Sequence, residues 1–280
     1  MKKHIVLLSA LLFQAVAVSA FAQDKPTAVP AEIDMSDFYP LGFSTVDEVL
    51  FAKFGLDLPW ADEVTFTNES QHEYVDLGLS VMWATCNVGA GKPEDYGDYY
   101  AWGELKPKES YTWENYRFRI RGYDEGSVRL SKYTSIYFTG LYDENGISIA
   151  DDKTQLDLED DVAHVRWGGN WRLPTDEEMN ELIDSCTWTW TTLNGVKGCR
   201  VTSNRSGYTD RSIFLPATGK YAFQPENISV GRWGYYWSSS VNRDKTSHTA
   251  ANLSFGSSFE RVIETLTFRN HGQSIRPVCP

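Results

Sequence analysis

Trp167-Gly-Gly-Asn-Trp-Arg-Leu-Pro-Thr-Asp-Glu-Glu-Met-Asn-Glu-Leu-Ile-Asp-Ser-Cys186 is the stretch that decides the fold. Thr175 can cap a helix while Glu178 reaches back to the Thr175 backbone N–H, which is the capping-box pattern. Pro174 and Met179 are placed as the matching hydrophobic staple. Apolar residues then recur at helical spacing, at Met179, Leu182, Ile183 and Cys186. The stretch predicts a capped amphipathic helix within a buried strand–turn–helix corner.

The first 22 residues predict an export signal. A basic start is followed by an apolar run from Ile5 to Phe21, and Ala20-Phe21-Ala22 resembles a cleavage site. No basic stop-transfer cluster follows, no later segment approaches the length of a spanning helix, and no cysteine at the cleavage point offers a lipid anchor. We expect a mature chain without a membrane span, exported to the cell surface, the exterior or the periplasm.

The composition excludes one class of partner and favours one class of structure. The formal charge of −12 argues against nucleic acid, because phosphate binding needs a local excess of Lys and Arg. Ten Trp residues and 21 Gly residues are typical of short strands joined by many turns.

Residues 23–71 differ in sequence pattern from the residues that follow them. After a flexible leader, a short helix is predicted from an apolar stripe that Gly55 closes: Val46, Val49, Leu50 and Phe54. This helix could dock on the main domain, mediate association with a partner, or belong to a loose linker.

From His72 onward the sequence predicts short strands. Thr187-Trp-Thr-Trp-Thr191 alternates with period two, so both Trp side chains share a face, and Asn194-Gly195 favours a type I′ hairpin turn. Residues 117–162 are polar and are predicted to form long surface loops. The remaining predicted strands are 74–77, 81–86, 196–202, 213–215, 235–238, 250–255 and 274–279.

Four cysteines in an exported chain predict two disulfides. The predicted hairpin sets Trp190 opposite Cys199 and Cys186 opposite Ser203, so Cys186 and Cys199 are roughly 13 Å apart, beyond disulfide reach. Two connectivities stay open. Cys86–Cys186 with Cys199–Cys279 is favoured over Cys86–Cys199 with Cys186–Cys279.

Six motifs in order resemble the Fibrobacter succinogenes major paralogous domain family, common in exported proteins of Bacteroides-type bacteria. The resemblance covers about residues 72–280. The motifs are Val75-Asp-Leu-Gly-Leu-Ser-Val-Met-Trp-Ala-Thr-Cys-Asn-Val-Gly89, Gly97-Asp-Tyr-Tyr-Ala-Trp-Gly-Glu104, Trp171-Arg-Leu-Pro-Thr175, Cys186-Thr-Trp-Thr-Trp190, Tyr236-Trp-Ser-Ser-Ser240 and Ile275-Arg-Pro-Val278.

The third motif, followed by an acidic helix, also resembles the formylglycine-generating enzymes, whose fold is a variant of the C-type lectin fold. The resemblance implies an α+β, C-type-lectin-like domain with a twisted antiparallel sheet, few helices and long loops. Those enzymes use a C-terminal cysteine pair as a copper-binding redox centre, and Cys199 and Cys279 do not form such a pair. No nucleophile elbow, His-x-x-His or Cys-x-x-Cys is present, so no enzymatic activity, catalytic residue or resident metal is predicted.

Calcium is a weaker hypothesis. Gln224-Pro-Glu-Asn227 resembles a lectin tripeptide that ligates Ca²⁺, but no Trp-Asn-Asp partner follows it. The acidic run Asp157–Asp161 and the turn Asp143–Gly146 could hold a cation, although acidic loops are more often simply solvated.

Binding is the function that the residues favour. In C-type-lectin-like folds the late region forms the ligand-facing loops, and relatives of this fold serve as targets of diversity-generating retroelements in a similar C-terminal segment. We predict an exported recognition module for carbohydrate or protein, with a structural subunit that assembles through residues 23–71 as the alternative. The candidate binding residues are Trp233, Tyr235, Tyr236, Asn242, Arg243, Asp244, His248, Phe259 and Arg261.

Overall fold

The computed structural model describes residues 72–280 except 122–127, 136–138, 223–225, 242–247 and 258. The chain divides into two units, residues 1–67 and 68–280. The predicted signal peptide (1–22) and leader (23–71) therefore lie outside the described residues.

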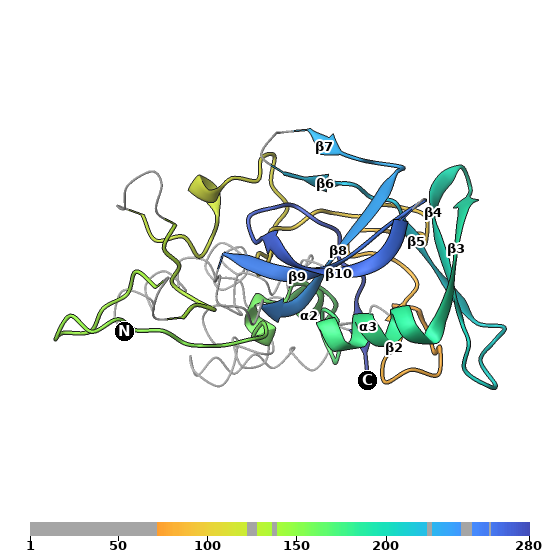
Figure 1. Cartoon of the computed structure of the whole chain (residues 1–280), viewed down its shortest axis with the longest axis horizontal. Helices are drawn as coiled ribbons and strands as arrows, with labels where there is room; N and C mark the ends of the chain where they lie inside the picture. Colours follow the sequence, from red (N-terminus) through yellow and green to blue (C-terminus); the bar gives the residue numbers. More distant parts are fainter. Residues whose placement is uncertain (1–71, 122–127, 136–138, 223–225, 242–247, 258) are drawn as a thin grey trace, which may run out of the picture. The chain divides into compact units, whose positions relative to one another are not determined.

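The described domain is α+β, with antiparallel sheets and few helices (Figure 1). Its sheets have the strand orders β1-β2-β11, β10-β9-β8, β3-β4-β5 and β6-β7. The helices are η5 (Trp113–Asn115), η6 (Leu158–Asp160), α2 (Val162–Trp167) and α3 (Asp176–Ser185). The strands are β1 (Tyr74–Val75), β2 (Met82–Ala84), β3 (Cys186–Leu193), β4 (Val196–Ser203), β5 (Ser212–Pro216), β6 (Lys220–Tyr221), β7 (Asn227–Ile228), β8 (Trp233–Val241), β9 (Thr249–Gly256), β10 (Phe259–Phe268) and β11 (Val278–Cys279).

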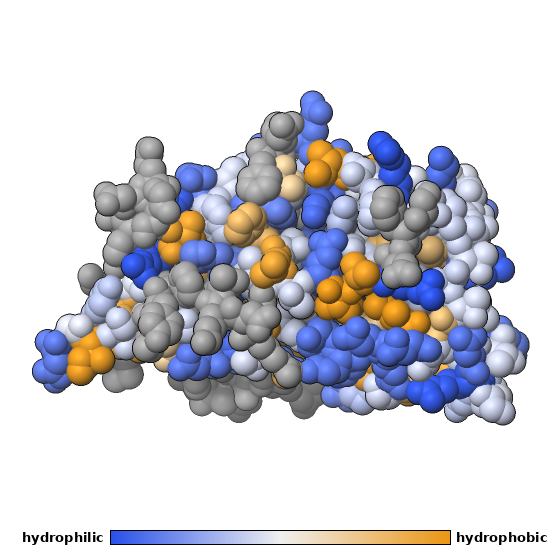
Figure 2. Space-filling view, viewed as in Figure 1, coloured by the Kyte–Doolittle hydropathy of each residue, from blue (hydrophilic) through white to orange (hydrophobic). Residues whose placement is uncertain are grey.

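The predicted capping box is confirmed at the start of α3. The Thr175 hydroxyl accepts the Glu178 N–H at 3.2 Å, and the Glu178 carboxylate accepts the Thr175 N–H at 2.8 Å. Arg172 adds a bidentate ion pair, with distances of 2.8 and 2.6 Å to the two Glu178 oxygens. Met179 and Leu182 are fully buried, and Figure 2 shows mainly hydrophilic residues in the region of α3 because its opposite face is acidic. The local sequence therefore fixes both the start of α3 and the face that it buries.

The Asn194-Gly195 hairpin is also confirmed. Both residues have positive φ, 47° and 88°, as a type I′ turn requires. The register pairs Trp190 with Cys199, as expected from the sequence. Trp188 and Trp190 share the face that packs against the core.

The prediction of surface loops for residues 117–162 was only partly right. Most of the described part of this region is irregular, but Leu130 and Tyr133 are buried in the core. Asp161 caps α2, a helix that was not predicted, by accepting the N–H groups of Ala163 and His164, and it also accepts the Leu173 N–H at 2.7 Å. Burial raises the pKa of Asp161 to about 6. Polar residues here satisfy buried backbone groups, which a hydropathy pattern does not reveal.

The predicted disulfides are contradicted, since all four cysteines are free thiols. Cys186 and Cys199 are four register positions apart in the hairpin. Burial raises the pKa of Cys186 to about 11 and that of Cys199 to about 12, so these thiols stay protonated at neutral pH.

The core contains two apolar clusters, one of which joins α3 to the sheets. Tyr236, Leu253 and Phe255 project from β8 and β9 into this cluster, where they meet Met179 and Leu182 of α3. The β8–β9–β10 sheet thus has one face covered by α3, and Figure 1 shows α3 running beside that sheet. On the opposite face Trp237 packs into the other cluster, whereas Trp233 and Tyr235 of the same strand are half-buried.

Candidate functional site

Four side chains gather on the face of the β8–β9–β10 sheet that points away from α3, and they define what we call the binding face. Tyr235 pairs in register with Ser254, and Ser254 pairs with Val262, so side chains at these positions share this side. Alternation along the strands adds Trp233 and Glu264 to it. Lys220 of β6 reaches over the same side. The binding face is therefore Trp233, Tyr235, Glu264 and Lys220.

Trp233 and Tyr235 form an aromatic pair at the centre of the binding face. Their ring centroids are 6.1 Å apart and the rings are nearly parallel, at 18°. Both side chains are half-buried. The Lys220 ammonium lies 4.1 Å from the Tyr235 centroid, in the geometry of a cation–π interaction. The pair thus presents aromatic surface with a cation at one edge.

Partial burial shifts the pKa values of Lys220 and Tyr235. Burial lowers the pKa of Lys220, while the charge of Glu264 opposes that shift. Burial raises the pKa of Tyr235 to about 12, so its hydroxyl remains a hydrogen-bond donor at neutral pH. Glu264 accepts the Ser254 hydroxyl at 2.7 Å and the Thr267 hydroxyl at 3.3 Å. An oriented carboxylate and an ammonium group therefore flank the aromatic rings.

Two buried amides adjoin the binding face. Asn252 pairs in register with Trp237 and with Glu264, and Gln273 directly precedes Ser274, which bridges to Tyr236. Both side chains are fully buried, and none of their amide nitrogen and oxygen atoms has a hydrogen-bond partner among the described residues. Buried polar atoms are normally satisfied, so each of these two amides marks a place suited to a buried water.

The predicted binding residues separate into different environments. Trp233 and Tyr235 belong to the binding face, on a strand rather than on a loop. Tyr236 was wrongly predicted, because it points into the core, is only 1% exposed and donates its hydroxyl to the Pro216 carbonyl at 2.7 Å. Adjacent strand residues point to opposite faces, so Tyr235 and Tyr236 cannot both contact one ligand.

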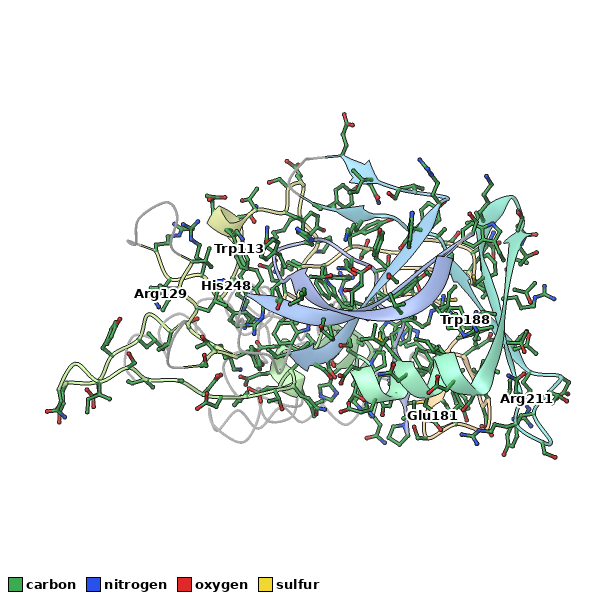
Figure 3. All side chains as sticks on the ribbon, viewed as in Figure 1. Trp113, Arg129, Glu181, Trp188, Arg211 and His248 are labelled. Atoms are coloured by element: carbon green, nitrogen blue, oxygen red, sulfur yellow. The ribbon has the colours of Figure 1, made fainter. Side chains whose placement is uncertain are left out.

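His248 and Arg261 are not part of the binding face either. His248 precedes the first residue of β9, whereas Trp233 pairs with Gly256 at its last residue, a separation of roughly 25 Å. Figure 3 shows His248 beside Trp113, with ring centroids 5.7 Å apart. Arg261 is exposed, and its positive charge opposes the rise in the pKa of Cys199. Because Cys199 belongs to the core cluster on the α3 side of the sheet, Arg261 lies on that side rather than on the binding face.

The other predicted binding residues are not placed. Asn242, Arg243 and Asp244 lie outside the described residues, between β8 and β9, and Phe259 is the first residue of β10, of whose side chain nothing is described. Sequence reasoning missed Lys220 and Glu264. The alternation of residues 261–264 could have indicated β10, but no local pattern places Lys220 over Tyr235.

The carboxylates of the acidic run form ion pairs with a lysine from another part of the chain. The Lys132 ammonium lies 2.7 Å from Asp157, 2.6 Å from Glu159 and 2.6 Å from Asp160. Arg117 pairs with Asp160 as well, at 2.9 Å. These three carboxylates form the one group among the described residues with metal-ligand spacing, and a lysine already occupies its centre.

Residues of the other two calcium motifs make hydrogen bonds to nearby backbone groups. One Asp143 carboxylate oxygen accepts the N–H groups of Asn145 and Ile147, which closes a turn. Asn227, from the Gln-Pro-Glu-Asn motif, donates its amide to the Thr218 carbonyl at 3.1 Å, and residues 224 and 225 are outside the described part of the chain. Among the residues that the structure describes, neither motif brings together a set of calcium ligands.

Comparisons with known proteins found no matching family model, no significantly similar curated protein and no significantly similar solved structure. Among the described helices, none has both the length and the apolar character needed to cross a membrane.

Proposed function

We propose that this chain is an exported, non-enzymatic recognition module, with a C-type-lectin-like domain of the Fibrobacter succinogenes major paralogous type. Six sequence motifs in the order of that family support the assignment. An α+β domain with antiparallel sheets and few helices is compatible with it. The predicted signal peptide supports export to the cell surface, the exterior or the periplasm.

The observation that carries the proposal is the half-buried pair of Trp233 and Tyr235 beside Lys220 and Glu264. Aromatic rings offer an apolar face to the C–H face of a sugar or to a protein side chain, and their polar edges stay hydrated. Carboxylate and ammonium groups bind hydroxyls by charge-assisted hydrogen bonds. This combination favours carbohydrate over protein as the ligand.

Calcium is not needed for this mode of binding. The side chains of the binding face supply donors and acceptors directly, through Lys220, Glu264 and the Tyr235 hydroxyl. The enzyme alternative receives no support from the thiols, since burial raises the pKa of Cys199 and of Cys279 and a reactive thiol needs a lowered pKa.

The rival proposal is a structural subunit that assembles through residues 23–71, which lie outside the described residues. A glycan array and a pull-down with the mature chain separate the two. Trp233→Ala combined with Tyr235→Ala should weaken binding to glycans that score positive by about 5- to 150-fold, because stacked aromatic contacts contribute roughly 1–3 kcal/mol together.

Tyr142→Ala is the matched control, because Tyr142 is 51% exposed and lies outside the binding face. It should leave glycan binding unchanged. If glycan binding is unchanged by the double substitution, the binding face is not the glycan-binding site and the proposal is wrong on this point. Loss of assembly on deletion of residues 23–71, with no ligand found on either screen, would favour the structural subunit.

A further inference from the structure

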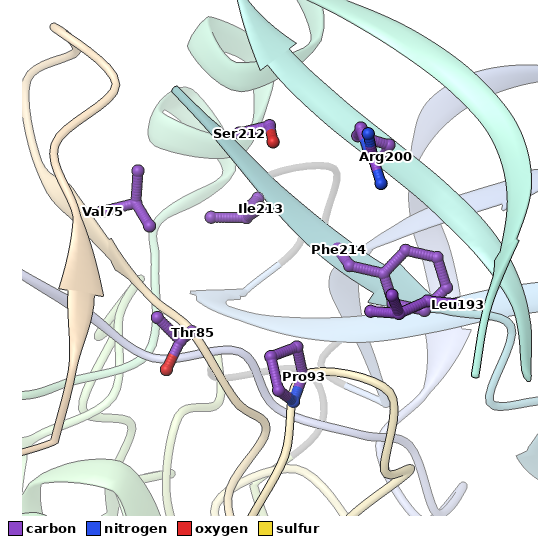
Figure 4. A pocket seen from close by; sticks show the side chains of 8 residues that line it. All are labelled: Val75, Thr85, Pro93, Leu193, Arg200, Ser212, Ile213 and Phe214. Atoms are coloured by element: carbon purple, nitrogen blue, oxygen red, sulfur yellow. The ribbon is translucent and has the colours of Figure 1, made fainter. Parts of the chain in front are cut away.

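A separate pocket of about 190 Å³ lies between the first strands and the β3–β4–β5 sheet (Figure 4). Val75 and Thr85 come from one side, and Ile213 and Phe214 come from β5 on the other. Pro93 and Leu193 complete the apolar part of the lining. None of these residues belongs to the binding face.

The two sides of the pocket are fastened to each other by the buried Arg276. Its guanidinium donates to the carbonyls of Ala84 and Thr85 at 3.0 and 2.9 Å, and to the Phe214 carbonyl at 3.0 Å. Arg276 is only 1% exposed. These hydrogen bonds fix the distance between the two walls, so the pocket is preformed.

A glycine on β4 shapes the Phe214 wall. A Cβ atom at Gly198 would lie 2.8 Å from the Phe214 ring and 2.3 Å from the Leu215 carbonyl oxygen. Only glycine therefore lets the Phe214 ring lie close against β4. This close approach leaves the apolar ring as part of the pocket lining.

The pocket also carries one cation. Arg200 lines it and pairs in register with Phe214, so their side chains lie on the same face of the sheet. Arg200 is exposed and makes no ion pair with any residue in the described part of the chain. The Arg200 guanidinium therefore lies beside the apolar walls without a carboxylate partner among the described residues. A ligand with a negative charge at one end and an apolar body would complement this lining.

We propose that this pocket binds a small carboxylate with an apolar body, such as a benzoate-sized acid. An apolar cavity of about 150 Å³ is enough to hold benzene, so the pocket can take one ring or a chain of similar size. The planar Arg200 guanidinium matches a carboxylate in a bidentate arrangement. The hydroxyls of Thr85 and Ser212 supply additional polar groups in the lining.

The experiment titrates the full exported chain with benzoate and with benzamide, its uncharged counterpart, and follows binding by calorimetry and by amide chemical shifts. Benzoate should bind saturably with Kd on the order of 1 mM or below, as befits so small a ligand. Benzamide should bind about tenfold more weakly, because it lacks the charge-assisted bonds to Arg200.

Arg200→Met should reduce benzoate affinity to that of benzamide. Arg205→Met is the control, because the Arg205 side chain is 49% exposed, pairs with Glu181 and lies outside the pocket. Val75→Phe should fill the pocket and abolish binding of both compounds. Trp233→Ala should leave benzoate binding unchanged, which keeps this test independent of the binding face.

Absence of saturable benzoate binding would overturn the proposal, and so would equal affinity for benzoate and benzamide. Benzoate binding that is unaffected by Arg200→Met would overturn it as well. If Val75→Phe fails to fold, the comparison of Arg200→Met with Arg205→Met decides alone, because neither substitution alters the apolar walls.

Discussion

Replacing Arg276 by Met should destabilise the domain more than any exposed charge substitution. The Arg276 guanidinium serves four acceptors, the carbonyls of Ala84, Thr85 and Phe214 and the Asn87 side chain, at 2.9–3.0 Å. Met fills a similar volume but cannot donate, so four acceptors, three of them in fully buried hydrogen bonds, lose their donor. At about 1 kcal/mol for each acceptor, the free energy of unfolding should fall by about 4 kcal/mol.

The assay is urea unfolding followed by tryptophan fluorescence, together with a thermal melt. A loss of about 4 kcal/mol corresponds to a fall in Tm of roughly 10 °C for a domain of this size. The m-value, which is the slope of the free energy of unfolding against urea concentration, should stay the same, because the surface exposed on unfolding does not change. Arg276→Lys should fall between, since one ammonium group cannot reach all four acceptors.

Arg211→Met is the matched control. Arg211 is also an arginine at the edge of this region, but its side chain is 43% exposed and its pair with Asp76 is 3.3 Å long. An exposed pair of this kind contributes at most about 1 kcal/mol. If Arg276→Met and Arg211→Met destabilise the domain equally, the carbonyls around Arg276 find other partners and the reasoning is wrong.

Three further predictions concern local features. Thr175→Ala should remove one half of the capping box and lower the free energy of unfolding by about 1 kcal/mol, measured in urea; no measurable loss would contradict the cap. In urea without reductant, Ellman's reagent should titrate four thiols, whereas two disulfides would leave none; in the native state Cys86 and Cys279 should react first, because the other two thiols are buried. Burial lowers the pKa of His271 from 6.5 to about 4, so the folded state favours the neutral ring. The resulting stability is present above pH 6.5 and is lost as the pH falls towards 4, by up to about 3 kcal/mol. His271→Gln should remove that part of the acid sensitivity, and unchanged pH dependence would exclude His271 as its source.

The features predicted correctly from sequence depend on residues close together in the chain. Thr175 and Glu178 are three residues apart, and Asn194-Gly195 determines the register of the hairpin on its own. In these cases the local geometry leaves few alternatives, so side-chain chemistry and turn type are sufficient. The packing of Trp188 and Trp190 on one face then follows from the period of the strand.

The binding face could be predicted only in part, because it is assembled from distant segments. Trp233 and Tyr235 were recognised as aromatic candidates, but the inclusion of Tyr236 ignored the alternation that places it in the core. Lys220 comes from a different sheet, and Glu264 comes from a strand whose polar residues resembled a loop. The position of β6 over β8 is determined by tertiary packing, which no short window of sequence contains.

The motifs that carry the family resemblance build the frame rather than the binding face. Arg172 exchanges backbone hydrogen bonds with Val278 at 3.0 and 2.9 Å, and the Ser239 N–H bonds to the Pro174 carbonyl at 2.7 Å. The Trp102 indole donates to the Ser238 carbonyl at 2.8 Å. Because Arg276 of the sixth motif also bonds to the Ala84 carbonyl of the first, five of the six motifs are joined directly to one another inside the protein.

Residues that hold a frame together are constrained by each other, whatever the ligand. The stretch from Trp167 to Cys186 therefore predicts a fold but does not indicate which ligand is bound. Lys220 and Glu264, which flank the aromatic pair, lie outside all six motifs, as do Trp233 and Tyr235. Arg200 in the pocket lies outside them too. A change of ligand between proteins with this frame should therefore appear as substitutions at these positions while the buried bonds of the motifs persist.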